Sequence, residues 1–246
     1  MQNRHIPRAI RWFAFVVRPL LMVLTKRDWQ GAEHLPTDGG YVLAPNHLSH
    51  LDPVLFGHFQ FDHGIAPRYL AKDALFEVPG LGRLMRAARQ VPVYRTSPGA
   101  AAESVRAACE AVAAGEAITV YPEGTITRDP DLWPMTGRTG AVRVALTTGR
   151  PLVPVLQWGP QDILWPYSKR PRIFPRTTYR VRVGPSIDLS DLAGRPVTDD
   201  VLATATDRLM NTLTDMMSEL RGRTPTAPRL DVRTLRARHT DDGREG

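Results

Sequence analysis

Apolar runs and amphipathic segments alternate along the middle of the chain. The run 117–121 is almost wholly apolar, whereas 201–220 carries apolar residues three or four positions apart, the spacing of one helix face. Helices are expected at 53–61, 80–88, 100–114, 139–148 and 201–220. Strands are expected at 41–44, 68–71, 91–94, 117–121, 152–156 and 179–183. This alternation predicts an α/β fold, a single domain with a mostly parallel central sheet flanked by helices.

The N-terminal segment has a different pattern, in which arginines share one face of an expected helix. Arg4, Arg8, Arg11 and Arg18 fall within an arc of about 80°, and most of the remaining circumference is apolar. Pro19 is expected to kink this helix or break it in two. The apolar stretch holds 17 residues including two arginines, whereas a membrane span needs about 20 mostly apolar residues. We expect an amphipathic, membrane-associating helix, with a helix packed on its own domain as the alternative.

Three segments follow from these patterns. Residues 1–30 are expected to form the N-terminal interfacial segment, and residues 31–221 the α/β domain. Residues 222–246 are rich in Arg, Thr, Pro and Asp, which favours a flexible basic tail.

The net charge narrows the choice of partner. The 246 residues include 32 Lys and Arg against 25 Asp and Glu, a formal charge of +7. Such an excess favours nucleic acid, anionic lipid or a phosphorylated substrate. Because the N-terminal arginines form one stripe beside apolar residues, an anionic membrane surface is favoured, and we expect no nucleic acid partner.

A histidine and a carboxylate follow the expected strand 41–44, at the edge where α/β sheets form their sites. His47 can act as a general base near neutral pH, and Asp52 can hold its imidazole in one tautomer. Pro53 favours the first helical position, which puts Asp52 at the N-cap. Asp52 could therefore be only a helix cap and His47 only a polar loop residue, and both interpretations stay open.

Other catalytic classes have weaker support in the sequence. His47, His50 and Asp52 could ligate a metal, but the H-E-x-x-H signature is absent, and we expect no metal. No G-x-S-x-G is present, and the sole cysteine, Cys109, lies in an alanine-rich helical run. The histidine would then have to activate a hydroxyl of the substrate. A metal-assisted hydrolase and a non-catalytic membrane- or RNA-binding protein remain alternatives.

A second polar cluster follows the strand 117–121. Gly124 permits a positive φ, Glu123 can accept a hydrogen bond from a substrate hydroxyl, and Thr125 with nearby N–H groups could receive a phosphate or an oxyanion. The alternative is a tight surface turn. Basic residues that could contact a phosphate are Lys72, Arg95, Arg128 and Arg138.

Four stretches, in order, resemble the four blocks of the 1-acylglycerol-3-phosphate acyltransferase family of the glycerophospholipid acyltransferase superfamily. They are Asn46-His47 with Asp52, Val91–Arg95, Tyr121–Thr125 and Leu152–Val155. The resemblance implies acyl transfer from acyl-CoA or acyl-carrier protein to a lysophospholipid hydroxyl, giving phosphatidic acid without a further cofactor. It implies a peripheral or monotopic protein on the cytoplasmic face of the cell membrane. Another lysophospholipid or glycolipid is the alternative acceptor.

The resemblance also implies roles for individual residues. His47 is expected to be the base and Asp52 its partner. The residues expected to bind substrate are Asn46, Lys72, Arg95, Glu123, Gly124, Thr125 and Arg128. The chain departs from the family pattern where Ile126 replaces the arginine that usually follows the third block, and Arg128 comes two positions later.

Overall fold

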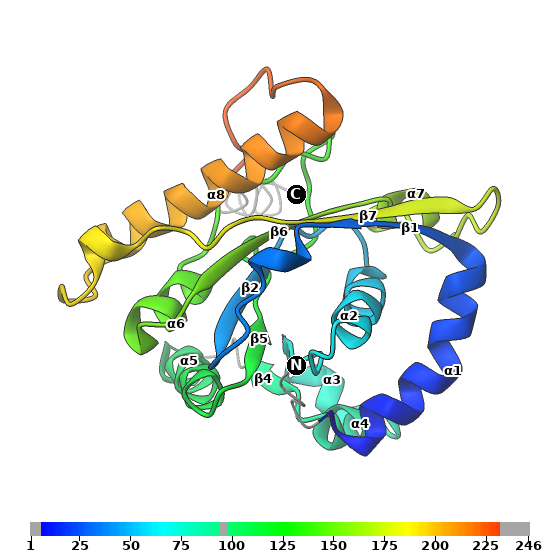
Figure 1. Cartoon of the computed structure of the whole chain (residues 1–246), viewed down its shortest axis with the longest axis horizontal. Coiled ribbons are helices and arrows are strands. Elements are labelled where there is room, and N and C mark those ends of the chain that lie inside the picture. Colours follow the sequence, from blue (N-terminus) through cyan, green and yellow to red (C-terminus); the bar gives the residue numbers. More distant parts are fainter. Residues whose placement is uncertain (1–5, 94–97, 232–246) are drawn as a thin grey trace, which may run out of the picture.

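The computed structural model describes residues 6–93 and 98–231. Its helices are α1 (Arg8–Leu24), α2 (Asp52–Asp62), α3 (Ala74–Glu77), α4 (Leu81–Ala87), α5 (Pro98–Ala113), α6 (Gly140–Thr148), α7 (Pro160–Ile163) and α8 (Asp199–Arg221). Its strands are β1 (Thr25–Gln30), β2 (Tyr41–Pro45), β3 (Leu70–Lys72), β4 (Val91–Val93), β5 (Ala117–Thr119), β6 (Leu152–Trp158) and β7 (Thr177–Val183). Two short 3₁₀ turns, η1 (Ala32–His34) and η2 (Ser190–Leu192), complete the elements (Figure 1).

The main sheet has the strand order β1-β7-β6-β2-β5. Its neighbours pair in parallel except β6 and β7, which are antiparallel, with Val155 opposite Val183. Strands β3 and β4 form a second, parallel pair, and a bridge between Tyr69 and Thr119 joins this pair to β5. The predicted α/β domain with a mostly parallel central sheet is therefore confirmed.

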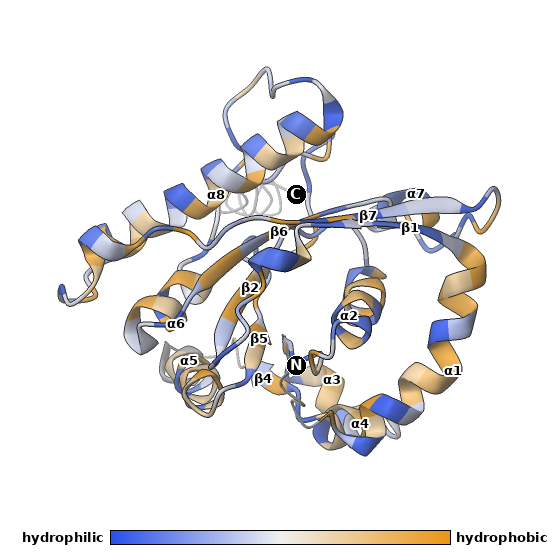
Figure 2. Ribbon diagram, viewed as in Figure 1, coloured by the Kyte–Doolittle hydropathy of each residue, from blue (hydrophilic) through white to orange (hydrophobic). Residues whose placement is uncertain are grey.

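The central strands are buried on both faces, which explains their apolar sequences. Neighbouring residues of a strand point to opposite faces. Val42 accordingly packs among residues of α5, α6 and α8, whereas the next residue, Leu43, packs against α2. Figure 2 shows the resulting apolar colour on β2, β5 and β6 and on the helix faces turned toward them. Parallel strands covered by helices on both faces are typically apolar in this way.

The edge strand β1 is the main difference from the sequence-based expectation. Residues 25–30, expected in the interfacial segment, instead pair with β7 in parallel, Thr25 opposite Thr177. The strand is largely polar, because only one side of an edge strand is covered. Its Asp28 pairs with two arginines of β7, at 2.9 Å from Arg182 and 3.5 Å from Arg180. Ion pairs thus replace the apolar alternation that would have revealed the strand.

The expected amphipathic helix is present as α1, and Pro19 lies inside it without ending it. Figure 1 shows α1 as one curved helix along the edge of the molecule. Arg18 holds it to α2 through Asp62, with 2.7 Å between Nε and Oδ1. The outer face is exposed, at Trp12, Phe15, Val16, Leu20 and Val23. No helix in the described part of the chain is long and apolar enough to cross a membrane.

Part of the expected flexible tail is packed in the structure. Helix α8 ends at Arg221 with Gly222 as its C-cap, and the guanidinium of Arg221 lies over two indole rings, 4.4 Å from that of Trp133 and 4.8 Å from that of Trp158. Further on, the backbone N–H of Thr136 donates to the carbonyl of Leu230 at 3.0 Å. Residues 229–231 therefore contact the body of the domain, whereas most of residues 222–228 are exposed. The tail's remainder, 232–246, lies outside the described residues.

Candidate functional site

The two predicted polar clusters meet at one edge of the sheet. Strands β2 and β5 are parallel neighbours, so their carboxyl ends lie side by side. His47 follows β2, and Glu123 lies four residues after β5. A backbone bond joins the clusters, since Thr127 N–H donates to the carbonyl of His47 at 2.8 Å.

His47 and Asp52 form a hydrogen-bonded pair. The imidazole Nδ1 lies 2.8 Å from Oδ2 of Asp52, whose side chain is fully buried, while that of His47 remains 15% exposed. The same oxygen accepts the backbone N–H groups of Leu48 at 2.6 Å and Ser49 at 3.0 Å. Leu51, rather than Asp52 as expected, occupies the N-cap position. The carboxylate of Asp52 instead points back toward the turn before α2, within hydrogen-bond distance of the imidazole of His47.

This geometry assigns the histidine tautomer. A carboxylate accepts a hydrogen bond from Nδ1–H, so the neutral ring carries its hydrogen on Nδ1 and leaves Nε2 unprotonated and able to take a proton. Tyr121 stacks on the ring of His47, with 4.1 Å between centroids and 23° between planes, and Tyr69 lies beyond it at 6.2 Å. The imidazole is thus fixed at its edge by Asp52 and on its face by Tyr121, a contact that the sequence did not reveal.

Glu123 supports the backbone of this site. Its Oε1 accepts the N–H of His47 at 3.0 Å, and its Oε2 accepts that of Met135 at 3.1 Å. The side chain is buried, and burial raises the pKa of Glu123 to about 8, although both N–H donors act to lower it. Glu123 was expected to accept a hydrogen bond from a substrate hydroxyl, and in the structure each of its carboxylate oxygens accepts a backbone N–H.

Asn46 ties the end of β2 to β6. The residue is fully buried, and its Nδ2 donates to the carbonyl of Gln157 at 3.1 Å, while the N–H of Gln157 donates to its Oδ1 at 2.6 Å. The hydroxyl of Tyr179 donates to Oε1 of Gln157 at 2.7 Å. Asn46 was expected to contact substrate, but its amide is engaged by β6. Gln157 was not identified from the sequence, although a glutamine following the apolar run 152–156 was a usable signal.

Gly124, Thr125 and Arg128 lie on one loop, and a second loop covers them. Gly124 has a φ of +67°, the conformation expected for a glycine. The hydroxyl of Tyr167 donates to the carbonyl of Ile126 at 2.8 Å and lies 3.3 Å from Oγ1 of Thr125. The guanidinium of Arg128 lies 5.3 Å from the ring centroid of Tyr167. Nothing in the sequence singled out Tyr167, which comes from the connection between α7 and β7.

The two remaining basic residues belong to the smaller sheet. Lys72 is exposed at the end of β3, opposite Val93 at the end of β4. Arg95 follows β4 by two residues and lies outside the described part of the chain. The register of β3 with β4 puts Lys72 beside Val93, at one end of this strand pair.

The possible metal ligands do not come together in the structure. No group of three or more His, Cys, Asp or Glu in residues 6–93 and 98–231 is arranged to hold a metal ion, so His47, His50 and Asp52 do not form a metal site.

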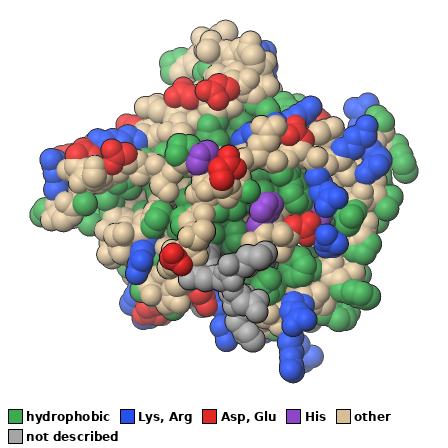
Figure 3. Space-filling view, in the orientation of Figure 1, with side chains coloured by type: hydrophobic (Ala, Val, Ile, Leu, Met, Phe, Trp, Pro, Cys, Tyr) green, Lys and Arg blue, Asp and Glu red, His purple; other side chains and the backbone are tan. Residues whose placement is uncertain are grey.

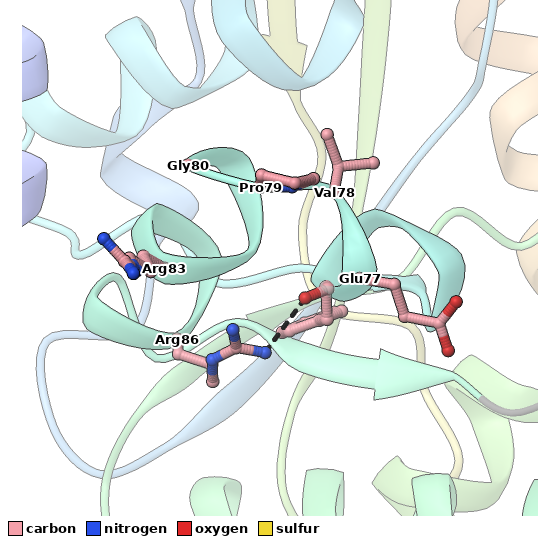
Figure 4. A pocket seen from close by; sticks show the side chains of 7 residues that line it. Glu77, Val78, Pro79, Gly80, Arg83 and Arg86 are labelled. Carbon is pink, nitrogen blue, oxygen red and sulfur yellow. Dashed lines mark hydrogen bonds between the residues drawn. The ribbon is translucent and has the colours of Figure 1, made fainter.

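A hollow on the surface lies apart from the His47 site. It has a volume of about 190 Å³, lies between α3 and α4, and is lined by residues 76–80 with Arg83 and Arg86. Arg86 donates to the carbonyl of Phe76 there at 2.9 Å (Figure 4). None of the predicted site residues lines this hollow.

Known proteins are similar to this chain in sequence and in fold. A model of the Acyltransferase family matches residues 26–158. A 1-acyl-sn-glycerol-3-phosphate acyltransferase of Bacillus subtilis is 26% identical over 85% of this chain and 98% of its own length. A chloroplastic enzyme of that name from Brassica napus is 31% identical, and the match spans 56% of this chain and 39% of the longer relative.

A solved structure shares the fold. The crystal structure of a 1-acyl-sn-glycerophosphate acyltransferase from Thermotoga maritima superposes with a TM-score of 0.64 at 19% identity, covering 88% of this chain and 81% of that one. The likeness extends well beyond the residues of the four sequence blocks.

Replacing Gly124 tests how closely its loop is packed. An added Cβ would lie 2.5 Å from Cδ of Arg138, whereas one added at Gly115, whose φ is also positive, would meet nothing within 4 Å. Gly115→Ala therefore reports the backbone strain alone, about 1 kcal/mol. We expect Gly124→Ala to lower the free energy of unfolding by about 1–3 kcal/mol more. Urea denaturation measures both, and equal losses would show that Arg138 moves aside without cost.

Glu123 is expected to make stability depend on pH. Its pKa is about 8 in the folded chain against 4.5 for a glutamate exposed to water, so ionisation is harder in the folded state. The free energy of unfolding should fall as pH rises from 4.5 to 8, by up to about 1.4 kcal/mol per unit. Glu123→Gln, which cannot ionise, should lack this decline.

Urea denaturation between these pH values measures this effect as the difference between wild type and variant. Glu219→Gln, on the exposed side of α8, is the matched control and should follow the wild-type curve. A difference between wild type and Glu123→Gln that stays constant with pH would contradict the assignment.

Proposed function

Since the chain belongs to the Acyltransferase family, we propose that it transfers a fatty acyl group from a thioester to the free hydroxyl of 1-acyl-sn-glycerol-3-phosphate. The product is phosphatidic acid, a phospholipid precursor. The observation that carries this proposal is the 2.8 Å bond between His47 Nδ1 and the buried Asp52 carboxylate. It leaves Nε2 of a partly exposed imidazole as a base for a hydroxyl of the substrate.

The proposed reaction is a direct transfer. Nε2 of His47 takes the proton of the acceptor hydroxyl while the hydroxyl oxygen attacks the carbonyl carbon of the thioester. Backbone N–H groups stabilise the oxyanion that forms. The C–S bond then breaks, and the imidazolium returns its proton to the leaving thiolate. Asp52 stabilises the imidazolium throughout.

Protein nucleophiles have little support as intermediates in this reaction. The hydroxyl of Ser49 is engaged in donating to the carbonyl of Leu164 at 2.7 Å. Cys109 lies in α5, and burial raises the pKa of its thiol, which disfavours the reactive thiolate. A substrate hydroxyl activated by His47 accounts for the site without either residue.

Substrate binding is assigned to the basic residues around this edge. We assign the acceptor phosphate to Arg95 and Lys72, with Arg128 and Thr125 contributing from the loop that follows Glu123. The donor is acyl-CoA or acyl-carrier protein as co-substrate, and the proposal includes no metal or other cofactor. Another lysophospholipid or a glycolipid remains the alternative acceptor.

Helix α1 supports attachment to a membrane surface. Its exposed apolar side chains span an arc of about 140° at 100° per residue, with the exposed arginines Arg8 and Arg11 at its border. Arginines near anionic lipid each contribute about 1 kcal/mol. We propose that the protein is peripheral or monotopic on the cytoplasmic face of the cell membrane and has no nucleic acid partner.

Replacing His47 with alanine tests the mechanism. We expect His47→Ala to lower kcat for acylation of lysophosphatidic acid by 10²–10⁴-fold, the contribution of a general base. His50→Ala is the matched control, because His50 is exposed and only its ring edge faces Tyr167, at 6.3 Å. Release of free thiol from an acyl thioester measures the rate. Equal activity of the two variants would remove His47 from the mechanism.

A further inference from the structure

The connection between α7 and β7, residues Leu164–Arg176, has an unusual composition. It contains four basic residues, no acidic residue and three prolines. The prolines oppose helix formation and limit the freedom of the chain. Its exposed large apolar and aromatic residues are Trp165, Tyr167, Ile173 and Phe174. Mixed aromatic and basic residues of this kind are typical of segments at a membrane–water interface.

The side chains of this segment, which we term the α7–β7 loop, project from the protein. Phe174 is 77% exposed, Trp165 51% and Ile173 43%. Lys169, Arg170 and Arg172 are exposed as well, and within the described residues none of them forms a salt bridge. Within the described residues, the apolar side chains are therefore exposed and the charges of Lys169 and Arg170 have no salt-bridge partner, whereas Arg172 interacts electrostatically with Asp162.

The loop lies beside α1 at one end, and at the other it contacts the turn that follows His47 and the loop that carries Thr125. Arg176 donates to the carbonyls of Met22 at 2.8 Å and Thr25 at 2.9 Å, where α1 passes into β1. At its other end, Leu164 accepts the Ser49 hydroxyl, and Tyr167 covers the loop that carries Thr125. Figure 3 shows hydrophobic and basic side chains together along the right-hand edge, over α1 and this connection.

We propose that the α7–β7 loop is a second membrane-contacting element. It places Trp165, Ile173 and Phe174 at the headgroup level of an anionic bilayer and its lysine and arginines against lipid phosphates. The inference rests on the proposed attachment of α1 and adds a second attachment point next to His47. An acidic carrier protein would complement the charge, but it would leave the projecting Phe174 and Trp165 unexplained.

Vesicle binding of the full chain tests the loop. The loop variant is Ile173→Ser with Phe174→Ser. The matched control is Val197→Ser, an exposed apolar residue two positions before α8, and Figure 1 shows the start of α8 at the opposite side of the molecule from β7. Co-sedimentation uses vesicles of phosphatidylcholine with phosphatidylglycerol. We expect about tenfold weaker binding for the loop variant, with unchanged thermal unfolding, and wild-type binding for the control.

A fluorescent probe reports directly where the loop lies. Cys109 is the only cysteine, so Cys109→Ala permits a single label at Phe174→Cys or, as control, at Val197→Cys. Lipids that carry a quencher near the headgroup should quench the label at position 174 and leave that at 197 unaffected. A label at 174 that stays unquenched on protein bound to vesicles would overturn the inference, while α1 attachment would stand.

Two further outcomes separate the loop from the rest of the proposal. The α1 variant Trp12→Ser with Phe15→Ser should also weaken sedimentation, and if only this variant did so, the loop would be excluded. The loop variant could instead bind vesicles normally, keep its activity with acyl-CoA and lose activity with acyl-carrier protein as donor. The loop would then be a docking site for that carrier protein, contrary to the inference. Protein that never sediments with vesicles would overturn both elements.

Discussion

One buried oxygen atom holds together the turn between β2 and α2. Oδ2 of Asp52 accepts Nδ1 of His47 and the N–H groups of Leu48 and Ser49. A carboxylate without exposure to water is costly unless such donors surround it. The turn therefore has to wrap around Asp52, and the imidazole orientation follows from this requirement. Glu123 acts similarly, because its carboxylate links the backbone of His47 to that of Met135.

Two residues expected to meet the substrate, Asn46 and Glu123, make hydrogen bonds within the protein that position the backbone around His47. The amide of Asn46 is bonded to β6, and both oxygens of Glu123 accept backbone N–H groups. Sequence identifies chemically capable side chains at a sheet edge but does not say which way they face. The direction depends on where distant N–H groups fall, and Met135, 12 residues after Glu123, has no local signal.

The fold was predictable where burial dictated the sequence. Strands β2, β5 and the centre of β6 are covered on both sides and read as apolar runs, and the match of the Acyltransferase family confirms the resemblance seen in four blocks. Strand β1 escaped because Asp28 pairs with arginines of β7. The antiparallel β6–β7 pairing also left no trace, since a pattern of buried residues carries no strand direction.

The direct passage from α1 into β1 has a mechanical consequence. No linker separates them, because Leu24 ends the helix and Thr25 begins the strand. If α1 binds to a surface, the sheet is therefore fixed in its orientation to that surface. The distance between the surface and Nε2 of His47 is then constant. The turnover rate should then depend on the density of substrate per unit area of bilayer. It should not depend on the diffusion of a domain joined to the membrane by a flexible linker.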